Sequence, residues 1–196
     1  MIFYIIGKSA SGKDTLYDKL MKEALGLKTY IIYTTRPKRD GEKEGHEYHF
    51  VDKKYIEDNK DKVIEERVYN TVFGEWIYAT IDDGNLDLDK NYLIIGTLES
   101  YNAIKKYFGK ENVYPIYLDV SYEIRRERAL KREREQKEPK YDEMERRLKA
   151  DEIDFSEENI KKAEIEKRYN ADNFDECTKI IISDIKGIID NGKIIK

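Results

Sequence analysis

The chain has 196 residues, of which 40% are charged and 39% hydrophobic, and its formal net charge is −4. This length is sufficient for one well-buried core with a small inserted subdomain. The mild acidic balance argues against nucleic-acid and acidic-membrane partners. No apolar stretch approaches the roughly 18 residues of a transmembrane helix, and no secretory leader precedes the first apolar run. The single cysteine, Cys177, excludes an internal disulfide, so we expect a cytoplasmic protein.

The first apolar run, residues 2–6, leads directly into a loop with the sequence Gly7-Lys8-Ser9-Ala10-Ser11-Gly12-Lys13-Asp14-Thr15. A buried strand, a glycine-containing loop and a helix in this order are typical of a P-loop, whose backbone N–H groups and helix N-terminus bind a polyphosphate. We expect Lys13 to be the catalytic cation that reaches the β- and γ-phosphates of ATP. The predicted ATP-binding residues are Gly7, Ser9, Ala10, Ser11, Gly12, Lys13, Asp14 and Thr15.

Asp14 stands where a P-loop usually has Ser or Thr, whose hydroxyl meets Mg²⁺. A carboxylate beside nucleotide phosphates is repelled unless a cation lies between them. One hypothesis is therefore that Asp14 orients Mg²⁺, directly or through water. The alternative is that Asp14 points outward and stabilises the N-terminus of its helix.

After the loop, strand and helix patterns alternate along the chain. Apolar residues at helical spacing predict a helix at 13–25, which ends at Gly26, and a strand follows at 29–33. Farther on, a helix at 98–108 separates strands at 91–95 and 112–119. The alternation predicts an α/β fold with three layers, in which helices cover both faces of a mostly parallel sheet.

Two regions depart from this alternation of strands and helices. Residues 34–81 contain strand-like runs separated by turns and one short helix, which predicts a small α+β insertion with antiparallel strands. Residues 121–168 are highly charged and mostly helical, and a last helix is expected at 174–189. We therefore divide the chain into a core (1–33, 82–120 and 169–196), an insertion (34–81) and a helical region (121–168).

A second motif begins after the strand at 29–33. Arg36 and Arg39 lie three residues apart, and Tyr48 follows on the next predicted strand. Two guanidinium groups and a phenol are suited to bind the oxygens of a phosphate monoester. A charged surface hairpin is the alternative explanation for these three residues alone.

We refer to Arg36, Arg39 and Tyr48 together as the clamp. The motif extends beyond these three residues. Its residues resemble, in type and spacing, the signature of the guanylate kinase family: Thr34-Thr35-Arg36, Arg39, Glu42, Gly45, Tyr48, Phe50 and Val51. The P-loop stands at the matching distance upstream, and the order of elements agrees to the C-terminus. The chain is similar in particular to guanylate-kinase-like proteins of anaerobic Gram-positive bacteria, at Gly7 to Thr15 and at Ile95-Gly96-Thr97-Leu98-Glu99-Ser100.

This resemblance implies a P-loop NTPase core, an inserted GMP-binding domain at 34–81 and a helical lid at 121–168. It implies transfer of the ATP γ-phosphoryl group to GMP or dGMP with Mg²⁺, in a monomer or homodimer of purine nucleotide metabolism. By the same resemblance, Glu65 accepts hydrogen bonds from guanine N1 and N2. The remaining implied residues are Arg36, Arg39, Tyr48 and Phe73 at GMP, and the catalytic arginines Arg36, Arg128, Arg132 and Arg147.

Several positions depart from the family pattern. Ile32 replaces a serine that touches guanine, and Phe73 lacks the hydroxyl of a phosphate-binding tyrosine, for which Tyr69 or Tyr78 could substitute. Gly96 and Leu98 replace two aspartates, of which the first supports Mg²⁺ and the second recognises guanine. Two alternatives therefore stay open. One is a P-loop kinase of another phosphomonoester, and the other is a non-catalytic module that binds a phosphorylated peptide.

Overall fold

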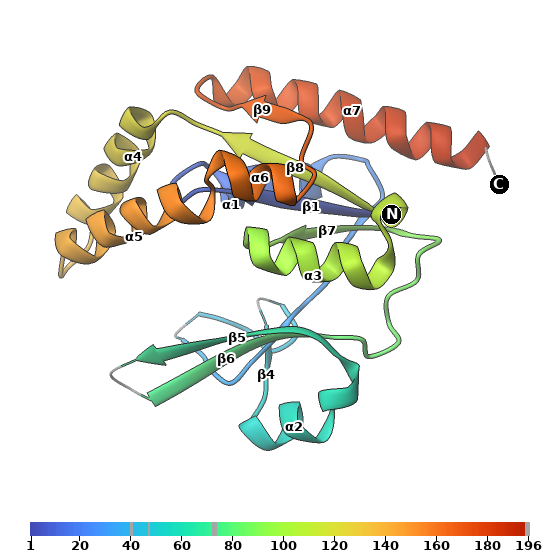
Figure 1. The fold of residues 1–196 in the computed structure, drawn as a ribbon, viewed down its shortest axis with the longest axis horizontal. Coiled ribbons are helices and arrows are strands. Elements are labelled where there is room, and N and C mark those ends of the chain that lie inside the picture. The colour runs from blue at the N-terminus through green and yellow to red at the C-terminus, as the bar shows by residue number, and fades with distance from the viewer. Residues whose placement is uncertain (40, 47, 72–73, 195–196) are drawn as a thin grey trace.

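The computed structural model describes residues 1–39, 41–46, 48–71 and 74–194 (Figure 1). Its centre is a five-stranded sheet in the order β2-β7-β1-β8-β9, in which every pair of neighbours is parallel. The strands are β1 (Ile2–Gly7), β2 (Leu27–Thr29), β7 (Asn91–Ile95), β8 (Val113–Asp119) and β9 (Arg168–Asn170). The predicted α/β fold with a mostly parallel sheet is confirmed.

Strand β1 lies in the middle of this sheet because its residues are apolar on both sides. All six are buried, and Ile5 is in register with Ile95 of β7 and Ile116 of β8. A continuous apolar run of this kind is typical of a parallel strand covered on both faces. The sheet therefore fixes where β1 ends, and the loop that follows begins at a defined point.

Helices cover both faces of the sheet (Figure 1). On one face, Ile2, Tyr4 and Ile6 pack with α3 and α6; on the other, Phe3 and Ile5 pack with α1 and α7. The helices are α1 (Lys13–Lys22), α3 (Leu98–Phe108), α4 (Tyr122–Arg134), α5 (Tyr141–Asp154), α6 (Glu157–Lys162) and α7 (Phe174–Ile194), with a 3₁₀ turn, η2, at Lys110–Asn112. None of the described helices is both long and apolar enough to cross a membrane.

A second sheet, in the order β4-β3-β6-β5, lies apart from the first on the side of α3 (Figure 1). It packs around a small apolar cluster that includes Tyr33, Ile56 and Ile77. Its elements are β3 (Tyr33–Thr34), β4 (His49–Phe50), α2 (Lys53–Asp58), a 3₁₀ turn, η1 (Lys60–Lys62), β5 (Val63–Thr71) and β6 (Gly74–Ile81). Antiparallel pairing holds for β5–β6 and β3–β6.

Pairing of β3 with β4 is parallel, which corrects the prediction of antiparallel strands throughout this region. The connection from Thr35 to Tyr48 is long enough to return the chain to the start of β3, as parallel pairing requires.

One further prediction of a single element was wrong, and one strand was not predicted. The strand expected at 29–33 is two strands, because the chain leaves the large sheet after Thr29 and enters the small sheet at Tyr33. Between them the buried Tyr30 donates a hydrogen bond to the carbonyl of Ile81, which joins the two sheets. Strand β9 was not expected, because Tyr169 is its one buried residue and its neighbours are exposed.

Candidate active site

The carboxyl ends of β1 and β7 open into a cleft between the two sheets, as expected for a parallel α/β sheet. One part is a cavity of about 730 Å³, and an adjoining hollow measures about 540 Å³. Residues that line both parts are Lys13, Arg67, Tyr69, Gly96 and Thr97. The hollow also borders Ile32, Tyr48, Tyr78 and Arg147, while the cavity also borders Ser9 and Asp151.

The loop after β1 has the backbone expected of a phosphate-binding loop. Gly12, the N-cap of α1, has a φ of +98°, a left-handed value that favours glycine. A Cβ at Gly12 would lie 2.9 Å from Cε2 of Phe174, at the start of α7. This close approach fixes the loop against the last helix, and the ammonium of Lys19 lies over the same ring.

Lys13 lies inside the loop that precedes it. Its Nζ donates to the carbonyl oxygens of Gly7 at 2.6 Å and Lys8 at 3.0 Å. Burial lowers the pKa of Lys13, against the opposing effect of Asp14 and Asp151. The ammonium is therefore held by loop carbonyls, and Lys13 lines both parts of the cleft.

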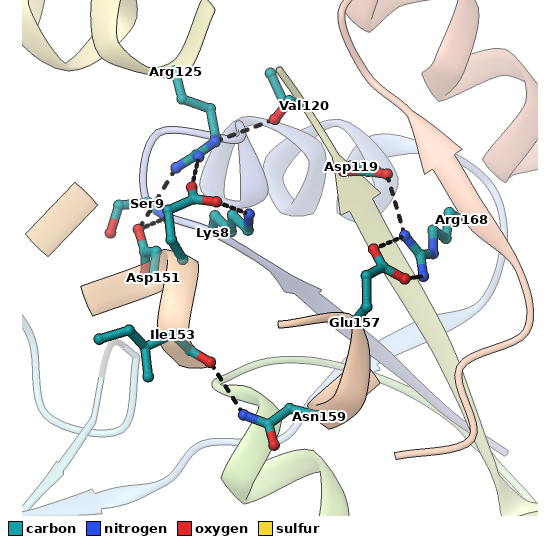
Figure 2. A network of polar contacts seen from close by, with 11 residues as sticks. Lys8, Ser9, Asp119, Val120, Arg125, Asp151, Ile153, Glu157, Asn159 and Arg168 are labelled. Atoms are coloured by element: carbon teal, nitrogen blue, oxygen red, sulfur yellow. Dashed lines mark hydrogen bonds and ion pairs between the residues drawn. The ribbon is translucent and has the colours of Figure 1, made fainter. Parts of the chain in front are cut away.

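Helix α5 places two carboxylates directly on this loop (Figure 2). Asp151 Oδ2 accepts the backbone N–H of Ser9 at 2.7 Å, and Glu152 Oε2 accepts from Lys8 Nζ at 2.6 Å. Arg125, which is 1% exposed, donates to Glu152 and, at 3.2 Å, to the carbonyl of Val120. A backbone N–H of an anion-binding loop is thus occupied by a carboxylate of the chain itself.

The expected lid arginines lie at different distances from the loop. Arg128 donates to the carbonyls of Ser11 at 3.5 Å and Ala171 at 3.2 Å. Arg147 lines the cleft and lowers the pKa of Lys13 as a minor contribution. Arg132 is exposed and borders, with Arg147 and Ser9, a small hollow between α4 and α5. All three therefore lie on the side of the cleft that holds the phosphate loop.

Arg36 and Tyr48 come together in the small sheet. Arg36 is 3% exposed, donates to both oxygens of Glu42 at 3.0 and 2.7 Å, and lies over the ring of Tyr48. Its Nε donates to the hydroxyl of Tyr78 at 3.1 Å. Hydrogen bonds from Arg36 lower the pKa of Glu42. The exposed Arg39 joins the group through its backbone N–H, which donates to Glu42 at 2.7 Å.

Glu65, on β5, is also held by a cation. Its side chain is 7% exposed and accepts from Arg67 Nε at 3.1 Å, from Arg67 Nη2 at 3.4 Å and from the Thr80 hydroxyl at 2.9 Å. Neither Arg67 nor Asp151 was among the predicted site residues, because a charged side chain on a polar strand or helix resembles a solvated one. Phe73, the remaining predicted residue, lies outside the described residues.

A carboxylate is excluded at Gly96 by packing. A Cβ there would lie 2.0 Å from the Tyr4 hydroxyl and 2.6 Å from Ser100 Oγ. Those two groups are hydrogen-bonded to each other at 2.7 Å, and burial raises the pKa of Tyr4. A tyrosine of β1 therefore fills the space at the end of β7 that an aspartate side chain would need.

The described residues contain no cluster of three or more His, Cys, Asp or Glu side chains able to hold a metal ion. Mg²⁺ does not need such a cluster, because it is usually bound by one or two carboxylates together with substrate phosphates and water. Asp14 is exposed in the first turn of α1, next to Lys13. Its carboxylate and the Thr15 hydroxyl fit this mode of binding.

The chain matches a family model described as guanylate kinase over residues 2–183. It is 30% identical over 141 residues to a guanylate kinase of Helicobacter hepaticus, an alignment that covers 67% of this chain and 66% of the relative. It is 39% identical over 85 residues to one of Neisseria gonorrhoeae, covering 42% and 40%. These alignments thus span less than two-thirds of either relative.

The fold is similar to the crystal structure of guanylate kinase from Anaplasma phagocytophilum. The TM-score is 0.64 with 21% identity, over 95% of this chain and 85% of the other. At 21% sequence identity, this similarity shows a shared fold alone.

Proposed function

The chain belongs to the guanylate kinase family, and from this premise we propose that it transfers the γ-phosphoryl group of ATP to GMP or dGMP, giving ADP and GDP. One observation supports this proposal above the others: Lys13 and Arg147 border the same hollow as Tyr48 and Tyr78. The loop residue Lys13 and the acceptor-site residue Tyr48 therefore border one space, which supports transfer between two bound phosphates.

On the donor side, backbone N–H groups of residues 7–15 and the N-terminus of α1 bind the ATP phosphates. Lys13 exchanges its loop carbonyls for phosphate oxygens. Arg128, Arg132 and Arg147 supply positive charge to the transferring group. Bound Mg²⁺ would neutralise phosphate charge, with Asp14 and Thr15 as its protein partners.

On the acceptor side, Arg36, Arg39 and Tyr48 bind the GMP phosphate. Glu42 fixes the guanidinium of Arg36 before substrate arrives, so less conformational entropy is lost on binding. Tyr78, whose hydroxyl accepts from Arg36, supplies the phenol that Phe73 lacks. Glu65 accepts a hydrogen bond from the guanine ring.

We also propose the division into a core (1–33, 82–120, 169–196), an acceptor-binding insertion (34–81) and a lid (121–168). Closure of the insertion and the lid over the cleft would exclude water from the γ-phosphate. We place the enzyme in the cytoplasm, as a monomer or homodimer acting on small molecules.

A coupled ADP-release assay with ATP and Mg²⁺ tests this function, using GMP, dGMP, AMP, CMP, UMP and several phosphorylated sugars as acceptors. We expect turnover with GMP and dGMP. Turnover with another acceptor alone would keep the P-loop chemistry and overturn the substrate. A folded protein inactive on the whole panel would favour the phosphopeptide-binding module.

The same assay separates the two sites. Arg39→Ala is expected to raise the KM for GMP more than the KM for ATP, because Arg39 belongs to the acceptor clamp. The opposite ranking would show that the two sites are reversed.

A further inference from the structure

We propose that Arg125 is a positioning residue for ATP binding: it takes over the carboxylate of Asp151 when the ATP phosphates displace that carboxylate from the backbone N–H of Ser9. The inference rests on the proposed function, which places ATP on the loop at residues 7–15. The side chain of Arg125 is 1% exposed, so it acts on the nucleotide through Asp151 and not by direct contact.

Arg125 is a buried cation that joins three segments of the chain near the phosphate loop. It lies in the first turn of α4, and its Nε donates to the carbonyl of Val120 at 3.2 Å. Its Nη2 donates to Oε1 of Glu152, and Oε2 of Glu152 accepts from Lys8 Nζ at 2.6 Å. Arg125 therefore connects the end of β8 and the last turn of α5 to the loop (Figure 2).

One nitrogen of this guanidinium remains unused. Within the part of the chain that the structure describes, the buried Nη1 of Arg125 has no hydrogen-bond partner. An unpaired buried donor is costly, and a charged one more so, which means that such a group calls for an explanation. Asp151 Oδ2 lies 3.8 Å from this nitrogen, just beyond hydrogen-bonding distance.

Asp151 Oδ2 thus has two donors within reach and is bound to one of them. It accepts the N–H of Ser9 at 2.7 Å, while Arg125 Nη1 stands 3.8 Å away. A shift of about 1 Å would bring the oxygen to hydrogen-bonding distance of Nη1. The N–H of Ser9 would then be free to donate to a phosphate oxygen.

The exchange answers an electrostatic problem of the loop. A phosphate and the carboxylate of Asp151 compete for the same N–H, because both are anionic acceptors. After ATP has bound, a carboxylate left without a partner beside the phosphates would be repelled by them. Arg125 supplies the partner and a positive charge at the same point. ATP binding then replaces one hydrogen bond of Asp151 by another and leaves no charge unpaired.

The test measures the Kd of Mg²⁺–ATP by titration calorimetry in Arg125→Met, alone and combined with Asp151→Asn. Without the guanidinium the displaced carboxylate has no partner, so Arg125→Met should weaken ATP binding about tenfold. Asp151→Asn removes the charge that needs the partner, so the double variant should bind ATP as tightly as Asp151→Asn alone. Weakening by the same factor in both backgrounds would show that Arg125 only supports the fold, and would overturn the inference. An unchanged Kd in Arg125→Met would overturn it as well.

Arg126→Met is the matched control. Arg126 is the next residue of α4 and also pairs with a carboxylate of α5, that of Glu145 at 2.7 Å, but neither residue lines the cleft. This variant should leave the Kd for ATP unchanged.

A second measurement decides the question if Arg125→Met does not fold. In a structure of the wild-type protein with Mg²⁺ and a non-hydrolysable ATP analogue, Asp151 Oδ2 should lie about 3 Å from Arg125 Nη1. Any other position of this carboxylate would overturn the inference and leave the kinase function standing. A wild-type protein that does not bind ATP at all would overturn the proposed function itself.

Discussion

The two sheets hold their functional residues by different forces. In the parallel sheet, β1 is buried along its whole length, and apolar packing on both faces determines where the phosphate loop begins. In the small sheet, β5 has no fully buried residue, and two arginines are held by carboxylates, Arg36 by Glu42 and Arg67 by Glu65. The donor side therefore depends on burial, while the acceptor side depends on ion pairs, which respond to pH and salt.

The largest effect is expected on the donor side, from Lys13→Ala. Loss of the only side-chain cation predicted to reach both β- and γ-phosphates should lower kcat by about 10²–10³. Coupled ADP release measures kcat, and thermal unfolding shows whether the variant is folded. An active, folded Lys13→Ala protein would mean that the loop does not bind the transferring phosphate.

Gly96→Asp tests whether tight packing against Tyr4 determines which side chain the parallel sheet accepts at the end of β7. The new Cβ would lie 2.0 Å from the Tyr4 hydroxyl, and overpacking of this kind costs about 1–3 kcal/mol, occasionally more. Urea unfolding should show this loss. Combined with Tyr4→Ala, the loss should be smaller than the sum of the two single losses. A strictly additive pair would show that Tyr4 does not fill the space.

Glu42→Gln tests whether the ion pair between Arg36 and Glu42 stabilises the fold, because such a contribution depends on pH. Because Arg36 lowers the pKa of Glu42 below its usual 4.5, the carboxylate stabilises the fold above that pH, and this contribution is lost as pH falls through the lowered value. We expect wild type to exceed the variant in free energy of unfolding by about 1–2 kcal/mol at pH 7. Urea unfolding between pH 3 and pH 7 should show the difference shrinking toward acid. A difference independent of pH would contradict the ion-pair explanation.

Asp151→Asn should have the smallest effect, on ATP binding. The carboxylate occupies the Ser9 N–H and repels phosphate, so its neutralisation should tighten Mg²⁺–ATP binding about threefold, within the weak range of partly exposed charges. Titration calorimetry measures the Kd, with Asp142→Asn in the first turn of α5 as control. Weaker binding instead would indicate that Asp151 serves as a Mg²⁺ partner.

Sequence patterns correctly predicted those strands and helices whose ends are determined by residues close by in the chain. The strand at 91–95 and the helix at 98–108 have the predicted bounds, because a short apolar run and the terminal Gly109 fix them locally. The change of sheets between Thr29 and Tyr33 could not be predicted, because both short strands belong to one continuous run of strand-forming residues.

For the candidate site, too, the sequence predicted the local features and not the contacts between distant residues. Loop geometry follows from the glycine spacing, and the structure brings Arg36 and Tyr48 together as expected. The contact of Asp151 with Ser9, and the exclusion of an aspartate at Gly96 by Tyr4, join residues far apart in the chain. Contacts of this kind depend on tertiary packing, which periodicity and composition do not encode.

The approach of Gly12 to Phe174 has a consequence for the order of folding. The phosphate loop is synthesised long before the ring that packs against it, which belongs to α7. Strand β1 likewise pairs with β7 and β8, which follow much later in the chain. Contacts of such long sequence separation form slowly, because the entropy of loop closure is lost before they stabilise the fold. A nascent chain therefore contains the phosphate loop long before the contacts that hold this loop in place can form.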